Sequence, residues 1–133
     1  MSSKDKPQKV LIVDDEDFIC NIYSKSFKDE GIETETVHSG KEMLDILEEK
    51  NNEYDVILLD IVMPEMDGFE ALEMAHKKEM LGRTLLVVLS NHADQISQEK
   101  AKELGAHNFV VKSSLLPEDI VKEVIGTFQE KSA

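Results

Sequence analysis

Cysteine and tryptophan are almost missing from this chain of 133 residues, which has one cysteine, Cys20, and no tryptophan. A single cysteine excludes an internal disulfide, and in an amphipathic segment it is typical of a small buried hydrophobic side chain. Long hydrophobic runs are missing too, because the longest, residues 10–13, 56–59 and 85–89, fall far short of the roughly 20 residues that cross a bilayer. The polar residues 1–8 lack the apolar core of a secretory signal. We therefore expect a cytoplasmic protein.

Positive charge is also scarce, since 15 Lys and Arg stand against 28 Asp and Glu, a formal net charge of −13 at pH 7. Such a surface repels polyanions and anionic headgroups, so direct binding of nucleic acid or membranes is not expected. The apolar share of 41% and the chain length fit one globular domain. We predict that domain at residues 9–129, after a flexible lead-in at residues 1–8 and before a frayed end at residues 130–133.

What the sequence does contain is a regular alternation of short apolar segments, rich in β-branched residues, with longer segments of helical period. The predicted strands are Lys9–Val13, Glu33–Val37, Val56–Asp60, Leu85–Leu89 and Asn108–Val111. The first, third and fourth are continuously apolar, as parallel strands covered by helices on both faces require. The second alternates charged with smaller residues, which is typical of an edge strand. Five such βα units predict an α/β fold with a doubly wound parallel sheet.

Apolar stripes and end signals mark the helices. The stripes are Phe18, Ile19, Ile22, Tyr23 and Phe27 in one segment and Ile120, Val121, Val124, Ile125 and Phe128 in another. Ser39, with Glu42 three residues later, is typical of a helix N-cap. Gly31 and Gly105 come just after helical segments, and Pro117 suits the first turn of the last helix. We expect each stripe to cover a face of the sheet.

Polar side chains follow the predicted strands at the points where they end. Asp14 and Asp15 follow the first strand and Asp60 closes the third, while Ser90 follows the fourth and Lys112 the fifth. In doubly wound sheets these ends meet at the edge where ligands bind. Three converging carboxylates repel one another unless a cation lies among them, and hard oxygen ligands favour Mg²⁺. Asp60 would then face an incoming phosphoryl group, with Lys112 and Ser90 available to its oxygens.

Together these positions resemble the receiver domain of two-component response regulators, over residues 9–128. The resemblance rests first on the acidic pair Asp14-Asp15 after Val10-Leu11-Ile12-Val13, and on the run Leu58-Leu59-Asp60-Ile61-Val62-Met63-Pro64 followed by Asp67-Gly68. It continues with Ser90 after Leu85-Leu86-Val87-Val88-Leu89, with Gly105-Ala106 before Phe109, and with Lys112 at the end of the last strand. Each feature alone is weak, and their order at the strand ends makes the set specific. The resemblance implies a flavodoxin-like (βα)5 three-layer sandwich whose five-stranded parallel sheet has the order 2-1-3-4-5.

The resemblance also implies a phospho-acceptor switch, which is not an enzyme in the ordinary sense because it catalyses only its own phosphorylation and dephosphorylation. Asp60 would accept the phosphoryl group from a sensor histidine kinase or a phosphotransfer protein. Asp14, Asp15, Asp60 and the main-chain carbonyl of Val62 would hold Mg²⁺, and Lys112 would contact the phosphate.

Ser90 and Phe109 are the switch pair that the resemblance implies. In that scheme phosphorylation draws the Ser90 hydroxyl inward and makes room for the Phe109 ring, which shifts a pre-existing equilibrium. The face that changes is built by the fourth helix, the fifth strand and the fifth helix. We expect an unknown downstream protein to read this face, because these 133 residues hold no DNA-binding or enzymatic output domain; a domain excised from a longer protein is the other explanation.

Four positions near the site depart from the family's pattern or tune its chemistry. Ser113 stands where a proline commonly follows the lysine across a cis peptide bond, which costs roughly 3 kcal/mol before any other residue. Asn91 is bulkier than the usual alanine or glycine, which predicts slow phosphorylation. Val62 and His92 occupy positions that tune loss of the phosphoryl group. Because an apolar Val62 cannot orient the attacking water, we predict a long-lived phosphorylated state.

Simpler explanations exist for each residue taken alone. Asp14 and Asp15 could cap the following helix. Lys112 could be a solvated charge, Ser90 a turn residue and Phe109 a core aromatic. Three other functions are also compatible with parts of the pattern. A flavodoxin-like electron carrier needs a Ser/Thr/Gly-rich loop after the first strand, where this chain is acidic. A phosphatase needs an acid two residues after its aspartyl nucleophile, where this chain has Val62. A degenerate receiver that only docks to partners stays possible because of Asn91 and Ser113.

Overall fold

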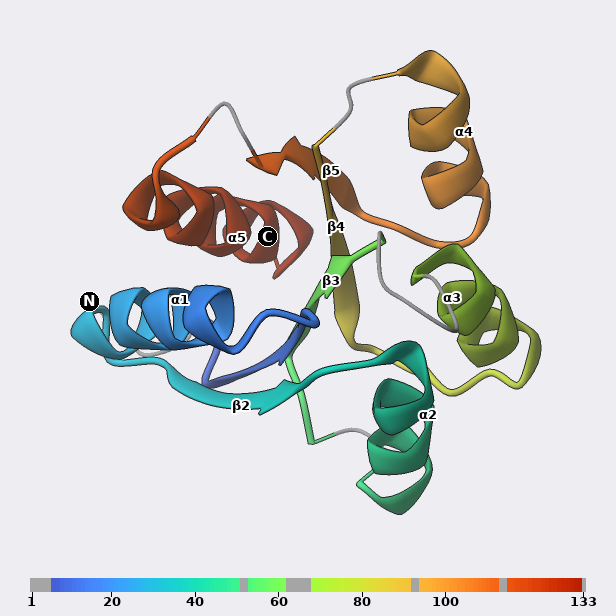
Figure 1. Cartoon of the computed structure of the whole chain (residues 1–133), viewed down its shortest axis with the longest axis horizontal. Helices are drawn as coiled ribbons and strands as arrows, with labels where there is room; N and C mark the ends of the chain where they lie inside the picture. Colours follow the sequence, from blue (N-terminus) through green and yellow to red (C-terminus); the bar gives the residue numbers. More distant parts are fainter. Residues whose placement is uncertain (1–5, 51–52, 62–67, 92–93, 113–114, 133) are drawn as a thin grey trace.

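Strands and helices alternate along the whole chain in the computed structural model, which describes residues 6–50, 53–61, 68–91, 94–112 and 115–132 (Figure 1). The strands are β1 (Lys9–Val13), β2 (Glu33–Val37), β3 (Val56–Asp60), β4 (Leu85–Ser90) and β5 (Asn108–Val111). The helices are α1 (Asp17–Asp29), α2 (Gly40–Glu49), α3 (Gly68–Lys77), α4 (Gln95–Glu103) and α5 (Pro117–Ser132). Among these helices, none is long and apolar enough to span a membrane.

All five strands are parallel in one sheet, in the order β2-β1-β3-β4-β5, which confirms the predicted fold. β2 lies at the edge, as its alternating sequence predicted, and β3 is central and buried along its whole length. β4 extends one residue beyond the predicted strand, so Ser90 is its last residue and pairs with Val111 of β5. The winding reverses at β1 and β3, and side chains at the carboxyl ends of these two strands are therefore neighbours.

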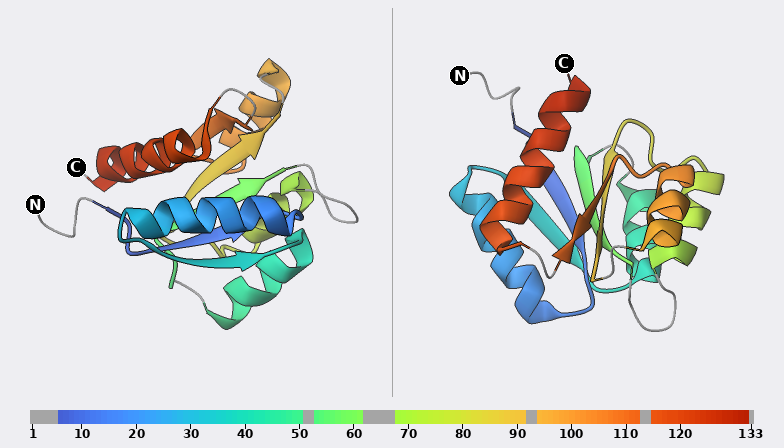
Figure 2. Two further views of the ribbon diagram at one scale, coloured as in Figure 1. Left: turned by 60° about the vertical axis from the view of Figure 1, so that its left-hand side comes forward. Right: turned by 90° about the horizontal axis from the view of Figure 1, so that it is seen from above.

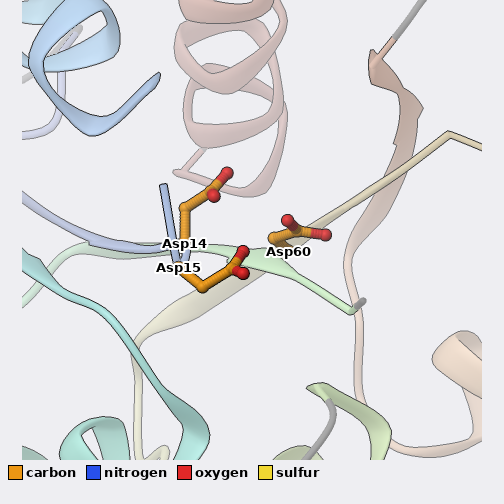
Figure 3. A group of neighbouring side chains, drawn as sticks. All are labelled: Asp14, Asp15 and Asp60. Atoms are coloured by element: carbon orange, nitrogen blue, oxygen red, sulfur yellow. The ribbon is translucent and has the colours of Figure 1, made fainter. Parts of the chain in front are cut away.

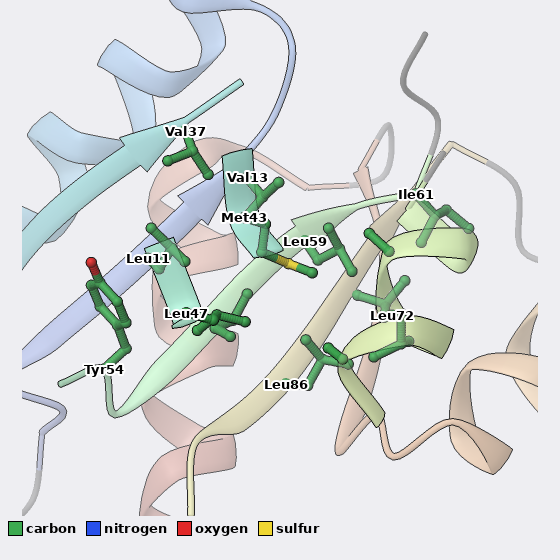
Figure 4. Close-up of a cluster of buried hydrophobic side chains, with 14 of the residues drawn as sticks. Leu11, Val13, Val37, Met43, Leu47, Tyr54, Leu59, Ile61, Leu72 and Leu86 are labelled. Atoms are coloured by element: carbon green, nitrogen blue, oxygen red, sulfur yellow. The ribbon is translucent and has the colours of Figure 1, made fainter. Parts of the chain in front are cut away.

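Helices cover both faces of the sheet, α1 and α5 on one face and α2, α3 and α4 on the other (Figures 1 and 2). The side chains of β1 alternate between the two cores beneath these helices. Leu11 and Val13 belong to the core with α2 and α3, whereas Val10 and Ile12 belong to the core with α1 and α5. Figure 4 shows the first of these cores, in which Leu72 of α3 lies over the sheet. Packing on both faces holds the strand ends in place.

The predicted helix ends are confirmed. Ser39 precedes α2, and its hydroxyl oxygen accepts a hydrogen bond from the amide of Glu42 at 3.1 Å. Gly31 and Gly105, with φ of 79° and 102°, follow α1 and α4 in the left-handed backbone region that favours a residue without Cβ. Pro117 is the first residue of α5, where its missing amide hydrogen leaves no helical bond unmade.

The predicted apolar stripe of α1 is wrong at Phe18. The buried side chains of this helix are Cys20, Tyr23 and Phe27, which are spaced as one helical face requires. Phe18 precedes Cys20 by two residues, or about 200° around the helix axis, and it is 73% exposed. An aromatic side chain near the start of α1 therefore faces solvent, whereas Cys20 is buried as predicted.

Candidate functional site at the carboxyl ends of the strands

Three carboxylates meet where the neighbouring strands β1 and β3 end. Asp14 and Asp15 follow β1, and Asp60 is the last residue of β3. One oxygen from each carboxylate lies within 4.8 Å of the other two, and Figure 3 shows the three side chains gathered at the strand ends. Asp14 and Asp60 are 1% and 5% exposed, whereas Asp15 is open to solvent. The structure therefore brings the three predicted acids together, two of them buried.

Lys112, just after β5, reaches into this acidic cluster. Its Nζ lies 2.9 Å from Oδ2 of Asp14 and 3.2 Å from Oδ2 of Asp60, and its side chain is 13% exposed. Burial on its own lowers the pKa of Lys112, but the hydrogen bond to Asp14 and the charges of both carboxylates outweigh burial and hold the pKa above its ordinary value. The lysine stays charged, and one cation offsets only part of the charge of three carboxylates.

The turn that carries the acidic pair is fixed by hydrogen bonds around Asp14. The Asp14 amide donates to the carbonyl of Val37 on β2 at 3.1 Å, and the carboxylate Oδ1 accepts the amide of Glu16 at 3.0 Å. The N-cap of α1 is Glu16, with no side-chain cap bond. Asp14 and Asp15 therefore precede the helix, and their simpler explanation as helix caps does not fit the structure.

Ser90 and Phe109 lie on neighbouring strands and share one face of the sheet. Phe109 pairs with Val88, which belongs to the core beneath α2, α3 and α4, and Phe109 packs against that core. Ser90 is two residues beyond Val88 on β4, so its side chain leaves the strand toward the same face. Ser90 is 2% exposed. Phe109 is half-buried, which is compatible both with the predicted switch role and with the simpler role of a core aromatic.

Gly68 shows how closely α3 approaches the end of β3. Its amide donates to the carbonyl of Ile61 at 3.0 Å. A Cβ at this position would overlap the Cα of Ile61 and lie 2.7 Å from the main-chain oxygen of Asp60. The glycine of the Asp67-Gly68 motif thus allows helix and strand to meet directly behind Asp60, a role that sequence reasoning did not assign.

The remaining predicted positions divide into two groups. Asn91 is described and is exposed beside the end of β4. Val62, His92 and Ser113 lie outside the described residues, so the predicted carbonyl ligand, the second tuning residue and the peptide geometry after Lys112 stay predictions.

Sequence reasoning missed one further contact. The thiol of Cys20 donates a hydrogen bond to the main-chain oxygen of Asp14, with Sγ and oxygen 3.4 Å apart. The two residues are six positions apart, with Asp14 in the turn after β1 and Cys20 in α1, so no periodic pattern in the sequence signals their contact.

Known proteins resemble this chain over most of its length. Residues 10–125 match the family model described as "Response regulator receiver domain". The chain is 35% identical over 104 residues to Regulatory protein AtoC of Escherichia coli (strain K12), which covers 78% of this chain and 22% of that protein. It is 34% identical over 124 residues to Hybrid signal transduction histidine kinase L of Dictyostelium discoideum, which covers 90% of this chain and 7% of that protein.

The chain thus spans less than a quarter of the length of either relative. A solved structure is matched almost end to end: the Vibrio cholerae chemotaxis protein CheY4 superposes with a TM-score of 0.79 and 30% identity, covering 90% of this chain and 97% of that chain. The acidic cluster is consistent with the phosphorylated aspartate site of such domains. By the family model and these relatives, the chain belongs to the response regulator receiver domains of two-component signalling.

Proposed function

We propose that this chain is a phospho-acceptor switch that takes a phosphoryl group on Asp60 with the help of Mg²⁺. The observation that carries the proposal is the surroundings of Asp60. Asp60 is 5% exposed at the end of the central strand, carboxylate oxygens of Asp14 and Asp15 lie within 4.8 Å of one of its own, and Lys112 Nζ lies 3.2 Å from its Oδ2. A carboxylate is a nucleophile that forms acyl phosphates. Carboxylates able to hold a metal ion and the Lys112 ammonium group both lie beside Asp60, which supports phosphoryl transfer to its carboxylate.

The acidic cluster fits a magnesium ion by its chemistry. Carboxylates are hard oxygen ligands, and three of them beside one lysine leave an excess of negative charge. We assign the ion to Asp14, Asp15 and Asp60, with the main-chain carbonyl of Val62 as a further ligand outside the described residues. When bound, Mg²⁺ supplies positive charge that stabilises the phosphoryl group during transfer.

The proposed reaction is a displacement at phosphorus. A carboxylate oxygen of Asp60 attacks the phosphorus of a phosphohistidine, the new O–P bond forms as the P–N bond breaks, and the leaving imidazole keeps the electron pair and takes up a proton from solvent. The Lys112 ammonium group gives up its hydrogen bond to Oδ2 of Asp60 and donates one to a phosphoryl oxygen instead. The Ser90 hydroxyl, buried at the end of β4, donates to another phosphoryl oxygen.

The phosphodonor is proposed to be a sensor histidine kinase or a phosphotransfer protein that docks beside this site. Phe18 and Leu116 are 73% and 60% exposed. Phe18 lies in the first turn of α1, and Leu116 immediately precedes α5. These two helices pack against each other and begin at the carboxyl end of the sheet. Exposed apolar side chains next to a buried acidic site are what a protein contact would cover.

The downstream partner is proposed to read the face built by α4, β5 and α5. Ala101 is the one buried residue of α4, all of which is described, so few contacts hold this helix to the sheet. A groove of about 520 Å³ lies along α4 and β5, and Phe109, Gln98 and Lys102 are among its lining residues. Because Phe109 shares a sheet face with Ser90, movement of the Ser90 hydroxyl would be felt in this groove.

The experiment that tests the proposal is the mass of the intact protein after incubation with acetyl phosphate, with and without Mg²⁺. We expect one Mg²⁺-dependent phosphoryl adduct in the wild type and none in Asp60→Asn. Asp45→Asn, which changes an exposed carboxylate on α2, is the matched control and should keep the adduct. An adduct that persists in Asp60→Asn would refute the assignment. No adduct in folded wild type with Mg²⁺ would favour a degenerate receiver that only docks to partners.

The lifetime of the phosphorylated state stays a prediction from the sequence. Val62→Asn adds a side chain able to orient an attacking water, so we expect faster loss of the phosphoryl group than in the wild type. Decay of the adduct by intact mass measures it, and equal decay rates would contradict a role for this position.

A further inference from the structure

Cys20 makes a contact that buried hydrophobic packing does not require. The side chain is 1% exposed in the core beneath α1 and α5. Its amide donates to the carbonyl of Glu16, four residues back, as in any helix. Its thiol instead reaches out of the helix to the main-chain oxygen of Asp14, with Sγ and oxygen 3.4 Å apart. The thiol therefore ties α1 to the end of β1.

The carbonyl that accepts this bond belongs to the peptide unit joining Asp14 to Asp15. Because a peptide unit is planar and rigid, fixing the direction of its carbonyl also fixes the direction in which the chain enters Asp15. The other polar atoms of Asp14 are bonded elsewhere: the amide to Val37, Oδ1 to the amide of Glu16 and Oδ2 to Lys112. The thiol is thus the link from α1 to the peptide between the two acids.

We propose that Cys20 is a positioning residue, whose thiol orients the peptide between Asp14 and Asp15 so that the exposed carboxylate of Asp15 converges with those of Asp14 and Asp60. The inference rests on the proposed Mg²⁺ site, whose ligands it pre-organises. A carbonyl oxygen can only accept a hydrogen bond, so the contact requires the proton to be on the Cys20 sulfur. Cys20 contacts neither the metal nor the phosphate in this scheme.

Two variants separate the hydrogen bond from packing. Cys20→Ala and Cys20→Ser both remove the sulfur, but only serine keeps a donor at this place. We expect the Mg²⁺ dissociation constant, measured by calorimetric titration at constant ionic strength, to rise about threefold in Cys20→Ala and to stay near wild type in Cys20→Ser, because one weak hydrogen bond is lost in the first alone. Val124→Ala, which trims another buried side chain of the same core, is the control and should lower stability without changing this constant.

A second measurement is made without metal. Solvent exchange of the Glu16 amide, which is bonded to Asp14 Oδ1, reports by NMR how firmly the turn is held. We expect faster exchange in Cys20→Ala than in Cys20→Ser or Val124→Ala. Equal exchange and equal Mg²⁺ affinity in the alanine and serine variants would overturn the role of Cys20. If the wild type binds no Mg²⁺, the metal assignment fails, and the exchange measurement still decides whether Cys20 orders the turn.

Discussion

The two ends of the sheet both hold acidic and basic side chains, but they balance charge differently. At the amino ends, Lys9 Nζ lies 2.6 Å from Glu35 and 3.5 Å from Glu33. Glu35 also accepts the Tyr54 hydroxyl at 2.9 Å and the Lys50 ammonium at 3.4 Å. At the carboxyl ends, three carboxylates lie together, and two of them, those of Asp14 and Asp60, contact the ammonium group of Lys112.

This difference separates a structural network from a binding site. Glu35 has three donors, so the amino-end network is satisfied by the chain itself and its members stabilise the sheet. The carboxyl-end cluster has two acids that are nearly inaccessible and more negative charge than Lys112 offsets, an arrangement that costs folding free energy and that the proposed Mg²⁺ would relieve. An excess of buried charge of one sign therefore indicates a ligand more strongly than does the number of charged residues.

The largest expected effect tests how precisely the carboxyl end is built. Gly68→Ala places a Cβ against Ile61 and Asp60, so we expect the free energy of unfolding to fall by about 2–3 kcal/mol and Asp60 phosphorylation to slow. Gly126→Ala is the matched control, because nothing lies within 4 Å of its added Cβ in α5. That change should raise stability by about 0.5–1 kcal/mol. Urea unfolding measures both, and equal effects would contradict the close packing behind Asp60.

The next effect tests the excess of negative charge. Asp15→Asn removes one of three neighbouring carboxylates, so we expect Mg²⁺ affinity to fall about tenfold or more and metal-free stability to rise by about 1 kcal/mol. Glu33→Gln at the amino end, whose side chain is 71% exposed, should change neither quantity measurably. Calorimetric titration and urea unfolding decide the matter. A loss of metal-free stability in Asp15→Asn would show that the cluster is not under electrostatic stress.

A smaller effect is expected from Lys9→Met at the amino end. The change keeps much of the aliphatic stem but removes the cation that contacts Glu35 and Glu33, so we expect a loss of about 1 kcal/mol in the free energy of unfolding. Phosphorylation of Asp60 by acetyl phosphate should be unchanged, because the network is at the opposite end of the sheet. If Lys9→Met were phosphorylated less than the wild type but were equally stable, the amino-end network would take part in function, and its purely structural role would be contradicted.

The smallest effect concerns pH. The hydrogen bond from Lys9, reinforced by Tyr54 and opposed by burial, holds the pKa of Glu35 below its ordinary value of 4.5. A depressed carboxyl pKa contributes stability above the unfolded value, and that contribution is lost as pH falls through the folded value. We therefore expect thermal unfolding of Glu35→Gln to depend less on pH below about 4.5 than that of the wild type. Parallel pH profiles would contradict this role of Glu35.

Local pattern was enough for much of the fold and of the site. Continuous apolar runs indicated buried parallel strands, and the polar residues placed directly after them, Asp14, Asp60 and Lys112, come together because parallel strands end at one edge. The same reasoning failed at Phe18, because spacing defines a stripe but not its width, and the helix is turned so that Cys20, Tyr23 and Phe27 face the sheet.

The sequence by itself determined which elements form, in which order they follow, and which polar residues stand at the strand ends. It could do so because the hydrophobic period of an element and the signals at its ends each extend over only a few neighbouring residues. The tertiary structure alone decided that Lys112 bonds both Asp14 and Asp60, that Gly68 is pressed against β3, and that the Cys20 thiol meets the Asp14 carbonyl. Such contacts depend on strand register and on the rotation of each helix about its axis. Both are set by packing of the whole core, to which every element contributes at once.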